Sequence, residues 1–224
     1  MMTTSSQVKS PARPGRRRKN DPERVRADIL AVATREFAEK GLSGARIDTI
    51  AEQTRASKRM IYYYFTDKET LYRHTLEAAY QKVRLQEAEL ELDHFPPLEA
   101  LSRLVRFTFN HHANNPDFIR LVMIENIHQG RYLSQSSLIQ SLNAGVIDAL
   151  TRVYQRGVEE GRFRPGLDPR ELHWLISALS FFNVSNQHTF SQIFDWQQMA
   201  PDNQSRLATH VTDMVLRYVS KELT

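Results

Sequence analysis

The sequence predicts an all-α chain, with an N-terminal three-helix head followed by a larger helical bundle. Between residues 45 and 68, two short segments with helically spaced apolar residues are separated by about four residues, the spacing of a helix-turn-helix. Beyond residue 70 the helical spacing continues, and no segment shows the period of two expected of a strand. We expect a disordered basic arm at 1–20, a helix-turn-helix domain at 21–70 and a second, helical domain at 71–224.

The first helix has clear start and stop signals. Asp21 is placed to cap its N-terminus, and Pro22 suits the first helical position because it lacks the amide that a helix start leaves unpaired. Gly41 is expected to end the helix. The apolar stripe between these signals packs under the helix-turn-helix and consists of Val25, Ile29, Val32, Ala33 and Phe37.

The helix-turn-helix is predicted from two apolar faces. Ile47, Ile50 and Ala51 form the first face, and the second consists of Ala56, Ile61 and Phe65. Ser57 is placed to cap the second helix by accepting an unpaired amide of the first turn. The outward residues of that helix are then Lys58, Arg59, Met60, Tyr62, Tyr63 and Tyr64. Cations and phenols on so short a helix suit phosphates and base edges.

This stretch resembles the TetR family of one-component repressors over roughly residues 24–71. The resemblance is carried by Ile50-Ala51, Ala56-Ser57, Ile61 to Phe65 and Lys68 to Leu71. The rest of the chain is similar only in its helical character. Where the family usually has a turn glycine, this chain has Arg55, at some strain if its φ is positive. The usual Thr before the second helix is Ala45, followed by Arg46, and the usual His before Phe65 is Tyr64.

The resemblance implies that the second helix of this motif reads DNA. We expect Lys58, Arg59 and Tyr63 to approach base edges, with Ser57 capping their helix. The residues expected to bind phosphates are Arg46, Tyr62, Tyr64 and Lys68. Lys68 would act near the amides at the start of the following helix.

Charge is concentrated in the N-terminal third. Residues 1–72 carry 15 Lys and Arg against 9 Asp and Glu, whereas the remaining residues carry 15 against 17. This asymmetry favours a nucleic-acid-binding head. The run from Arg13 to Lys19 is either an arm that adds modest affinity along the DNA backbone or minor groove, or a solubilising tail.

The second domain is predicted as a series of helices delimited by caps and prolines. Thr66-Asp67 caps a long, charged helix that joins the two domains, and Pro96-Pro97 ends the pattern. Further helices are expected at 98–112, from Asn115-Pro116-Asp117 toward Gly130, at 134–160, from Asp168-Pro169 onward, and around 207–218.

The last two helices carry apolar residues on more than one face. Each could bury one face inward and the other against a second copy, which makes a four-helix dimer interface, as the resemblance also implies. We expect the interface residues to be Leu172, Ile176, Leu179, Leu207, Val211 and Met214. The alternative is a helix that is fully buried within one chain.

The bundle is also expected to hold a small-molecule effector. The resemblance places the pocket in segments that contain Phe107, His111, Phe118, Met123, Asn126, Phe181 and Phe182, although phenylalanine at this spacing is also ordinary core. If Arg103, Arg106, Arg120 or a histidine faces the pocket, an anionic aromatic effector follows, because a buried carboxylate requires a paired cation. The adjacent His111 and His112 point about 100° apart on a helix, so we expect at least one at the surface.

The sequence lacks the motifs that are typical of several classes of enzyme, metal-binding protein and membrane protein. There is no cysteine, no glycine-rich nucleotide loop, no GxSxG or HExxH motif and no apolar run of about 18–20 residues. We therefore expect no enzyme, metal, cofactor or membrane association, and a cytoplasmic location.

The function these features predict is a homodimeric repressor that binds a palindromic double-stranded operator and is released by a small-molecule effector. The alternative is an architectural or activating DNA-binding protein, in which the bundle serves only dimerisation.

Overall fold

The computed structural model describes residues 21–221, and the basic arm expected at 1–20 lies outside them. Within the described residues the chain has ten α-helices and no strand, so the all-α prediction is confirmed. The α-helices are α1 (Pro22–Gly44), α2 (Ile47–Gln53), α3 (Lys58–Phe65), α4 (Lys68–Ala88), α5 (Pro97–Asn114), α6 (Pro116–Ile127), α7 (Ser137–Glu159), α8 (Pro169–Ser185), α9 (Gln187–Phe194) and α10 (Pro201–Val219). Short 3₁₀ helices lie at η1 (Leu92–His94) and η2 (Leu133–Gln135).

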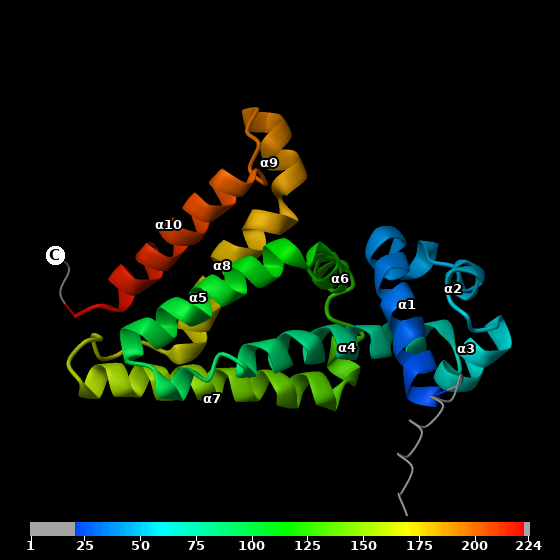
Figure 1. Ribbon diagram of the computed structural model, residues 1–224, viewed down its shortest axis with the longest axis horizontal. Helices are drawn as coiled ribbons and strands as arrows, with labels where there is room; N and C mark the ends of the chain where they lie inside the picture. Colours follow the sequence, from blue (N-terminus) through cyan, green and yellow to red (C-terminus); the bar gives the residue numbers. More distant parts are fainter. Residues whose placement is uncertain (1–20, 222–224) are drawn as a thin grey trace, which may run out of the picture.

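The three helices of the head lie at one end of an elongated molecule (Figure 1). Asp21 caps α1 by accepting the amide of Glu23, as predicted. Gly41 leaves the helical conformation with φ of 67°, and one more turn follows before Gly44. The helix thus breaks where the sequence indicated, but the element runs beyond the break.

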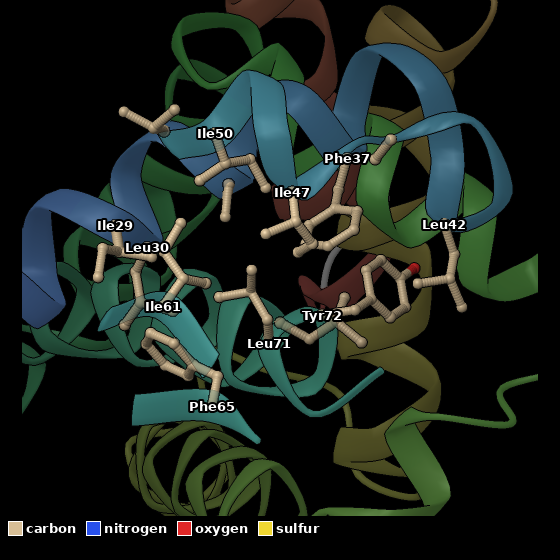
Figure 2. Close-up of a cluster of buried hydrophobic side chains, with 14 of the residues drawn as sticks. Ile29, Leu30, Phe37, Leu42, Ile47, Ile50, Ile61, Phe65, Leu71 and Tyr72 are labelled. Atoms are coloured by element: carbon tan, nitrogen blue, oxygen red, sulfur yellow. The ribbon is translucent and has the colours of Figure 1, made fainter. Parts of the chain in front are cut away.

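A buried apolar cluster holds the head together (Figure 2). Ile50 of α2, Phe65 of α3 and Leu71 of α4 are fully buried in it, and the ring of Phe37 meets that of Tyr72 edge-on at 5.0 Å. The cluster also takes in Leu121, Tyr132 and Ile139 from α6, the following turn and α7. Hydrophobic packing therefore continues across residues 70 and 71, where we expected the domains to part.

The turn between α2 and α3 is organised by side chains. Thr54 accepts the amide of Ala56 at 3.2 Å, and Ser57 accepts the amide of Met60 at 3.2 Å, which caps α3 as predicted. Arg55 is not among the described residues with positive φ, so it carries no left-handed strain. The strained residue is Thr66, between α3 and α4, with φ of 60°. A β-branched residue in such a conformation costs about 1–3 kcal/mol.

The bundle has a second apolar cluster built around α5. Leu104 and Phe109 of α5 are buried against Leu172 and Ile176 of α8 and Val211 of α10. In Figure 1, α4 and α7 run side by side from the head along one edge of the bundle, and α10 ends at the far side. No helix among residues 21–221 is both long and apolar enough to cross a bilayer.

Two glycines of α7 provide a matched test of packing. A Cβ at Gly157 would lie 2.0 Å from Cδ2 of the buried Phe163 ring, whereas a Cβ at Gly145 would meet no atom within 4 Å. Gly157→Ala should therefore lower the free energy of unfolding by about 1–3 kcal/mol or more, because the core would be overpacked. Gly145→Ala should raise it by about 0.5–1 kcal/mol, because alanine favours the helix. Urea unfolding measures both, and equal shifts of the two variants would contradict this packing.

Candidate nucleic-acid interface and ligand cavity

The outer face of α3 is polar and exposed. Ile61 and Phe65 point into the head, with exposures of 1% and 0%. The opposite face exposes Lys58, Arg59, Met60, Tyr62 and Tyr63 to solvent. Tyr63 protrudes furthest, with 82% of its surface exposed, and Tyr64 is half-buried with its ring edge-on to Tyr63 at 5.4 Å. The helix therefore presents cations and phenols outward on a rigid base.

Lys58 is held at the start of α3 by an ion pair. Its Nζ lies 2.9 Å from Oδ1 of Asp48 on α2, and about half of each side chain is exposed. This hydrogen bond, together with Coulombic attraction, raises the pKa of Lys58 and lowers the pKa of Asp48. The positive charge of Arg46, the N-cap of α2, lowers the pKa of Asp48 further and partly offsets the rise in the pKa of Lys58. An exposed pair of this kind is worth little energy, so a phosphate can replace the carboxylate.

The other expected phosphate-binding cations lie at junctions between helices. The backbone amide of Arg46 donates to the buried carboxylate of Glu36 at 3.1 Å, which fixes the start of α2 on α1. Lys68 donates to the carbonyl of Ser43 at 3.3 Å and so joins α4 to the end of α1. The carboxylate of Asp67 caps α4 by accepting the amide of Thr70 at 2.7 Å.

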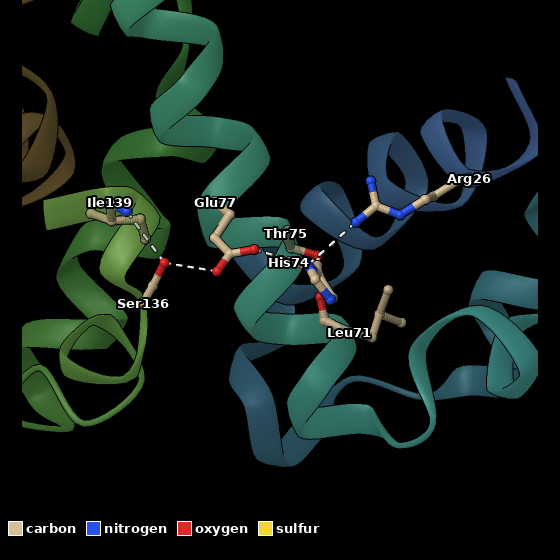
Figure 3. A network of polar contacts seen from close by, with 7 residues as sticks. All are labelled: Arg26, Leu71, His74, Thr75, Glu77, Ser136 and Ile139. Carbon is tan, nitrogen blue, oxygen red and sulfur yellow. Dashed lines mark hydrogen bonds and ion pairs between the residues drawn. The ribbon is translucent and has the colours of Figure 1, made fainter. Parts of the chain in front are cut away.

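A polar network links the head to the bundle (Figure 3). Nδ1 of His74 lies 2.8 Å from Glu77 on α4 and 3.3 Å from Nη2 of Arg26 on α1. A single ring nitrogen carries one proton, so the shorter contact is the one that donates, toward Glu77. The other carboxylate oxygen of Glu77 accepts from Ser136 at 2.7 Å, and Ser136 in turn caps α7. One carboxylate thereby joins α4 to the start of α7.

The bundle contains a cavity of about 480 Å³ between α4, α5, α6, α7 and α8. Four of the seven residues expected to bind an effector lie on its wall: Phe107, Phe118, Asn126 and Phe181. Phe182 lies outside with 51% of its surface exposed, and Met123 is half-buried away from the wall. His111 instead lines a separate cavity between α1, α4 and the α5–α6 junction.

The expectation that His111 or His112 lies at the surface is wrong, because both are buried, at 7% and 8% exposure. Their rings meet the ring of Phe118 at 5.8 and 6.0 Å. Since Phe118 comes from α6, the neighbouring helix covers both imidazoles.

Several residues of the cavity wall were missed by sequence reasoning. None of Arg103, Arg106 and Arg120 lies on the wall, and the arginine that does is Arg84 of α4. Other wall residues that sequence reasoning missed are Tyr80, Glu87, His112, Asn143, His173, Trp174 and Ser177. The available signal was the repetition of Tyr80, Val83, Arg84 and Glu87 at helical spacing on one face of α4.

Three of the six residues expected at a dimer interface are buried inside the chain. Leu172, Ile176 and Val211 have exposures of 1%, 0% and 7%, and all belong to the core of the bundle, so they have no surface left for a partner. Leu179 and Leu207 are half-buried, and Met214 is 55% exposed. The large apolar residues that α8, α9 and α10 expose are Trp174, Phe182, Ile193, Phe194, Met214 and Tyr218. The sequence-based prediction therefore assigned to the dimer interface the face of α8 that is buried within the chain.

Acidification should destabilise the protein between about pH 6.5 and 4. Burial lowers the pKa of His111, His112 and His173 from 6.5 to about 4, with a smaller contribution from nearby positive charge. In this window the unfolded chain binds protons that the folded chain does not, so the free energy of unfolding falls as pH falls and is largest above pH 6.5. Urea unfolding across this range measures the loss.

The variant His112→Leu should lose less stability than the native chain over the same pH range. His94→Leu, at an exposed position of η1, controls for the removal of a histidine. Equal pH dependence in His112→Leu and the native chain would contradict a neutral, buried His112.

Comparisons with known proteins agree with this geometry. The family model described as "Bacterial regulatory proteins, tetR family" matches residues 29–75, which span the helix-turn-helix. The model described as "Tetracyclin repressor-like, C-terminal domain" matches residues 97–215, more than half of the chain.

Relatives of similar length support the same assignment. The chain is 31% identical over 200 residues to the HTH-type transcriptional repressor NicS of Pseudomonas putida, which covers 89% of this chain and 94% of NicS. It is 30% identical over 150 residues to the HTH-type transcriptional regulator RutR of Escherichia coli, 67% of this chain and 69% of RutR. The crystal structure of the transcriptional regulator SCO4942 from Streptomyces coelicolor is 26% identical, with a TM-score of 0.64 over 85% of this chain and 97% of that one. The chain therefore belongs to the TetR family of DNA-binding transcriptional regulators.

Proposed function

We propose that this chain is a homodimeric repressor that binds a palindromic operator and leaves it when a small molecule enters the cavity of the bundle. The observation that carries the proposal is the exposed outer face of α3, where Lys58, Arg59, Tyr62 and Tyr63 project from a rigid head. The relative NicS is named a transcriptional repressor, which favours repression over activation.

The contacts proposed with DNA follow from the position of each side chain. Lys58, Arg59 and Tyr63 reach base edges from α3, because their side chains are exposed on its outer face. The residues that bind the flanking phosphates are Arg46, Tyr62, Tyr64 and Lys68, with Ser57 capping α3. Lys58 exchanges Asp48 for DNA, because the ion pair is exposed and weak.

Dimerisation is supported by the apolar surface of the last helices. Trp174 and Phe182 lie on the outer face of α8, and Met214 lies on that of α10, each at least half exposed. Two such surfaces related by a two-fold axis bury one another and make a four-helix interface. The heads would then meet successive major grooves on one DNA face, about 34–36 Å apart.

Release by a ligand is supported by the two environments of α4. Its first half supplies Leu71 and Tyr72 to the core of the head, and its second half supplies Tyr80, Arg84 and Glu87 to the wall of the cavity. A ligand that prefers a shifted α4 changes the spacing of the two heads, so the two half-sites can no longer be met together.

Replacing Lys58 and Tyr63 together by alanine should abolish discrimination between the operator and unrelated DNA while preserving the dimer. The two side chains contribute exposed functional atoms and little packing, so the fold has no need of them. Fluorescence anisotropy with operator and scrambled duplexes measures discrimination, and sedimentation measures the dimer. Unchanged operator binding would defeat the assignment of α3 as the recognition helix.

Lys68→Ala should weaken binding to all duplexes alike and reduce the slope of log affinity against log salt by about one, because one phosphate contact is lost. Arg103→Ala, at an exposed ion pair of α5 far along the chain from the head, serves as the control and should leave the slope unchanged. A loss confined to operator DNA would show that Lys68 reads bases instead.

A further inference from the structure

Five of the sixteen residues that line the cavity in the bundle are phenylalanine, tyrosine or tryptophan. Tyr80 comes from α4, Phe107 from α5, Phe118 from α6, and Trp174 and Phe181 from α8. A volume of about 480 Å³ lies within the range of sites for small molecules. Rings that come from four helices favour a flat ligand that can stack or meet them edge-on.

One cation stands on this wall. Among the described residues that line the cavity, Arg84 is the only lysine or arginine. Its guanidinium contacts the carboxylate of Glu87 one turn later through Nη1, and both side chains are largely buried, at 14% and 10% exposure. Nε of Arg84 is buried and has no hydrogen-bond partner. A buried donor without a partner is costly, so the free edge of Arg84 favours an acceptor supplied from outside.

The two histidines of the wall are uncharged at neutral pH. His112 and His173 have pKa values lowered to about 4, mainly by burial. Nδ1 of His112 is also buried without a partner, on a side chain only 8% exposed. Burial raises the pKa of Glu87 even beside Arg84, so its carboxylate is poorly solvated there. The wall thus offers one guanidinium, one neutral imidazole with a free nitrogen, and aromatic faces.

We propose that the cavity binds a small, planar aromatic carboxylate, anchored through its carboxylate by Arg84 and held by the surrounding rings. The carboxylate engages the guanidinium edge that includes Nε, while Nη1 keeps its contact with Glu87. Arginine binds carboxylates through two parallel N–H groups, which fixes the plane of the ligand as well as its charge. This inference rests on the proposed function, because it names the class of the effector.

The anchor also places the ligand on the helix that supports the head. Arg84 and Glu87 lie on α4, two to three turns after His74, which lies 3.3 Å from Arg26 of α1, and after Glu77, which accepts from the cap of α7. A ligand held by Arg84 therefore acts directly on the element whose position fixes the head.

Isothermal titration calorimetry on the purified full-length chain tests the ligand class. The probes are one- and two-ring aromatic carboxylates, each paired with its neutral carboxamide. The native chain should bind at least one carboxylate about tenfold or more tightly than the matching carboxamide, because a charge-assisted pair is lost with the amide. Carboxamides that bind as tightly as carboxylates, or a panel without any binding, would overturn the proposal.

Variants of Arg84 and Glu87 test whether Arg84 anchors the carboxylate of the ligand. Arg84→Met should remove the preference for carboxylate over carboxamide, whereas Arg103→Met, in the exposed Glu99–Arg103 pair of α5, should preserve it. Glu87→Gln keeps the shape of the wall but removes the competing negative charge, so it should tighten carboxylate binding severalfold. This second variant gives an answer even if Arg84→Met fails to fold. A preference unchanged in Arg84→Met, or carboxylate binding weakened in Glu87→Gln, would contradict the assignment.

Operator binding separates this inference from the proposed function. If the chain binds its operator but none of the probes, the proposed ligand class is wrong and the repressor function stands. If the chain binds the probes but no DNA, the ligand site stands and the proposed repressor function is wrong.

Discussion

The packing of α4 is the constraint on which the rest of the structure depends. This helix of 21 residues is about 30 Å long, and its two halves belong to different hydrophobic environments. Leu71, Tyr72 and Leu76 are buried in the cluster of the head, whereas Val83 is buried beside the cavity of the bundle. Because a helix is stiff over this length, the head cannot reorient independently of the cavity wall.

Polar contacts at the middle of α4 also fix its position relative to neighbouring helices. Glu77 lies at the middle of α4 and bonds both to His74, which faces α1, and to Ser136, which caps α7. Such contacts require defined geometry, so they favour discrete arrangements of α4 and α7 over continuous sliding. The ring of Phe65 at the end of α3 lies 5.7 Å from the ring of His74, so the same group of residues contacts α3. Phe65, His74 and Glu77 therefore form a continuous set of contacts from the end of α3 to the middle of α4.

Local pattern was sufficient for every α-helix of the described residues except α9, which was not predicted as a separate helix. It was also sufficient for the outer face of α3, because the period of Ile61 and Phe65 fixes which side is buried. It was insufficient where burial depends on distant elements. Arg84 and Glu87 resemble a solvated pair at i and i+3, and only the approach of α8, with His173 and Trp174, makes them part of a cavity.

Two other differences between prediction and structure also arise from contacts that the local pattern does not show. Helix α8 is apolar on two faces, so the sequence does not reveal that Ile176 turns inward and Trp174 outward. Arg55 does not have the positive φ that would strain it, and the side chain of Thr54 organises its turn; a positive φ occurs instead at Thr66.

The central claim is that two copies of α3 bind adjacent major grooves of one duplex. Hydroxyl-radical footprinting of the DNA upstream of the gene for this chain tests it most directly. The proposed homodimer predicts two protected patches on one face of the duplex, related by two-fold symmetry and separated by about one helical turn. An absence of protection at low ionic strength, or a single patch without symmetry, would contradict it.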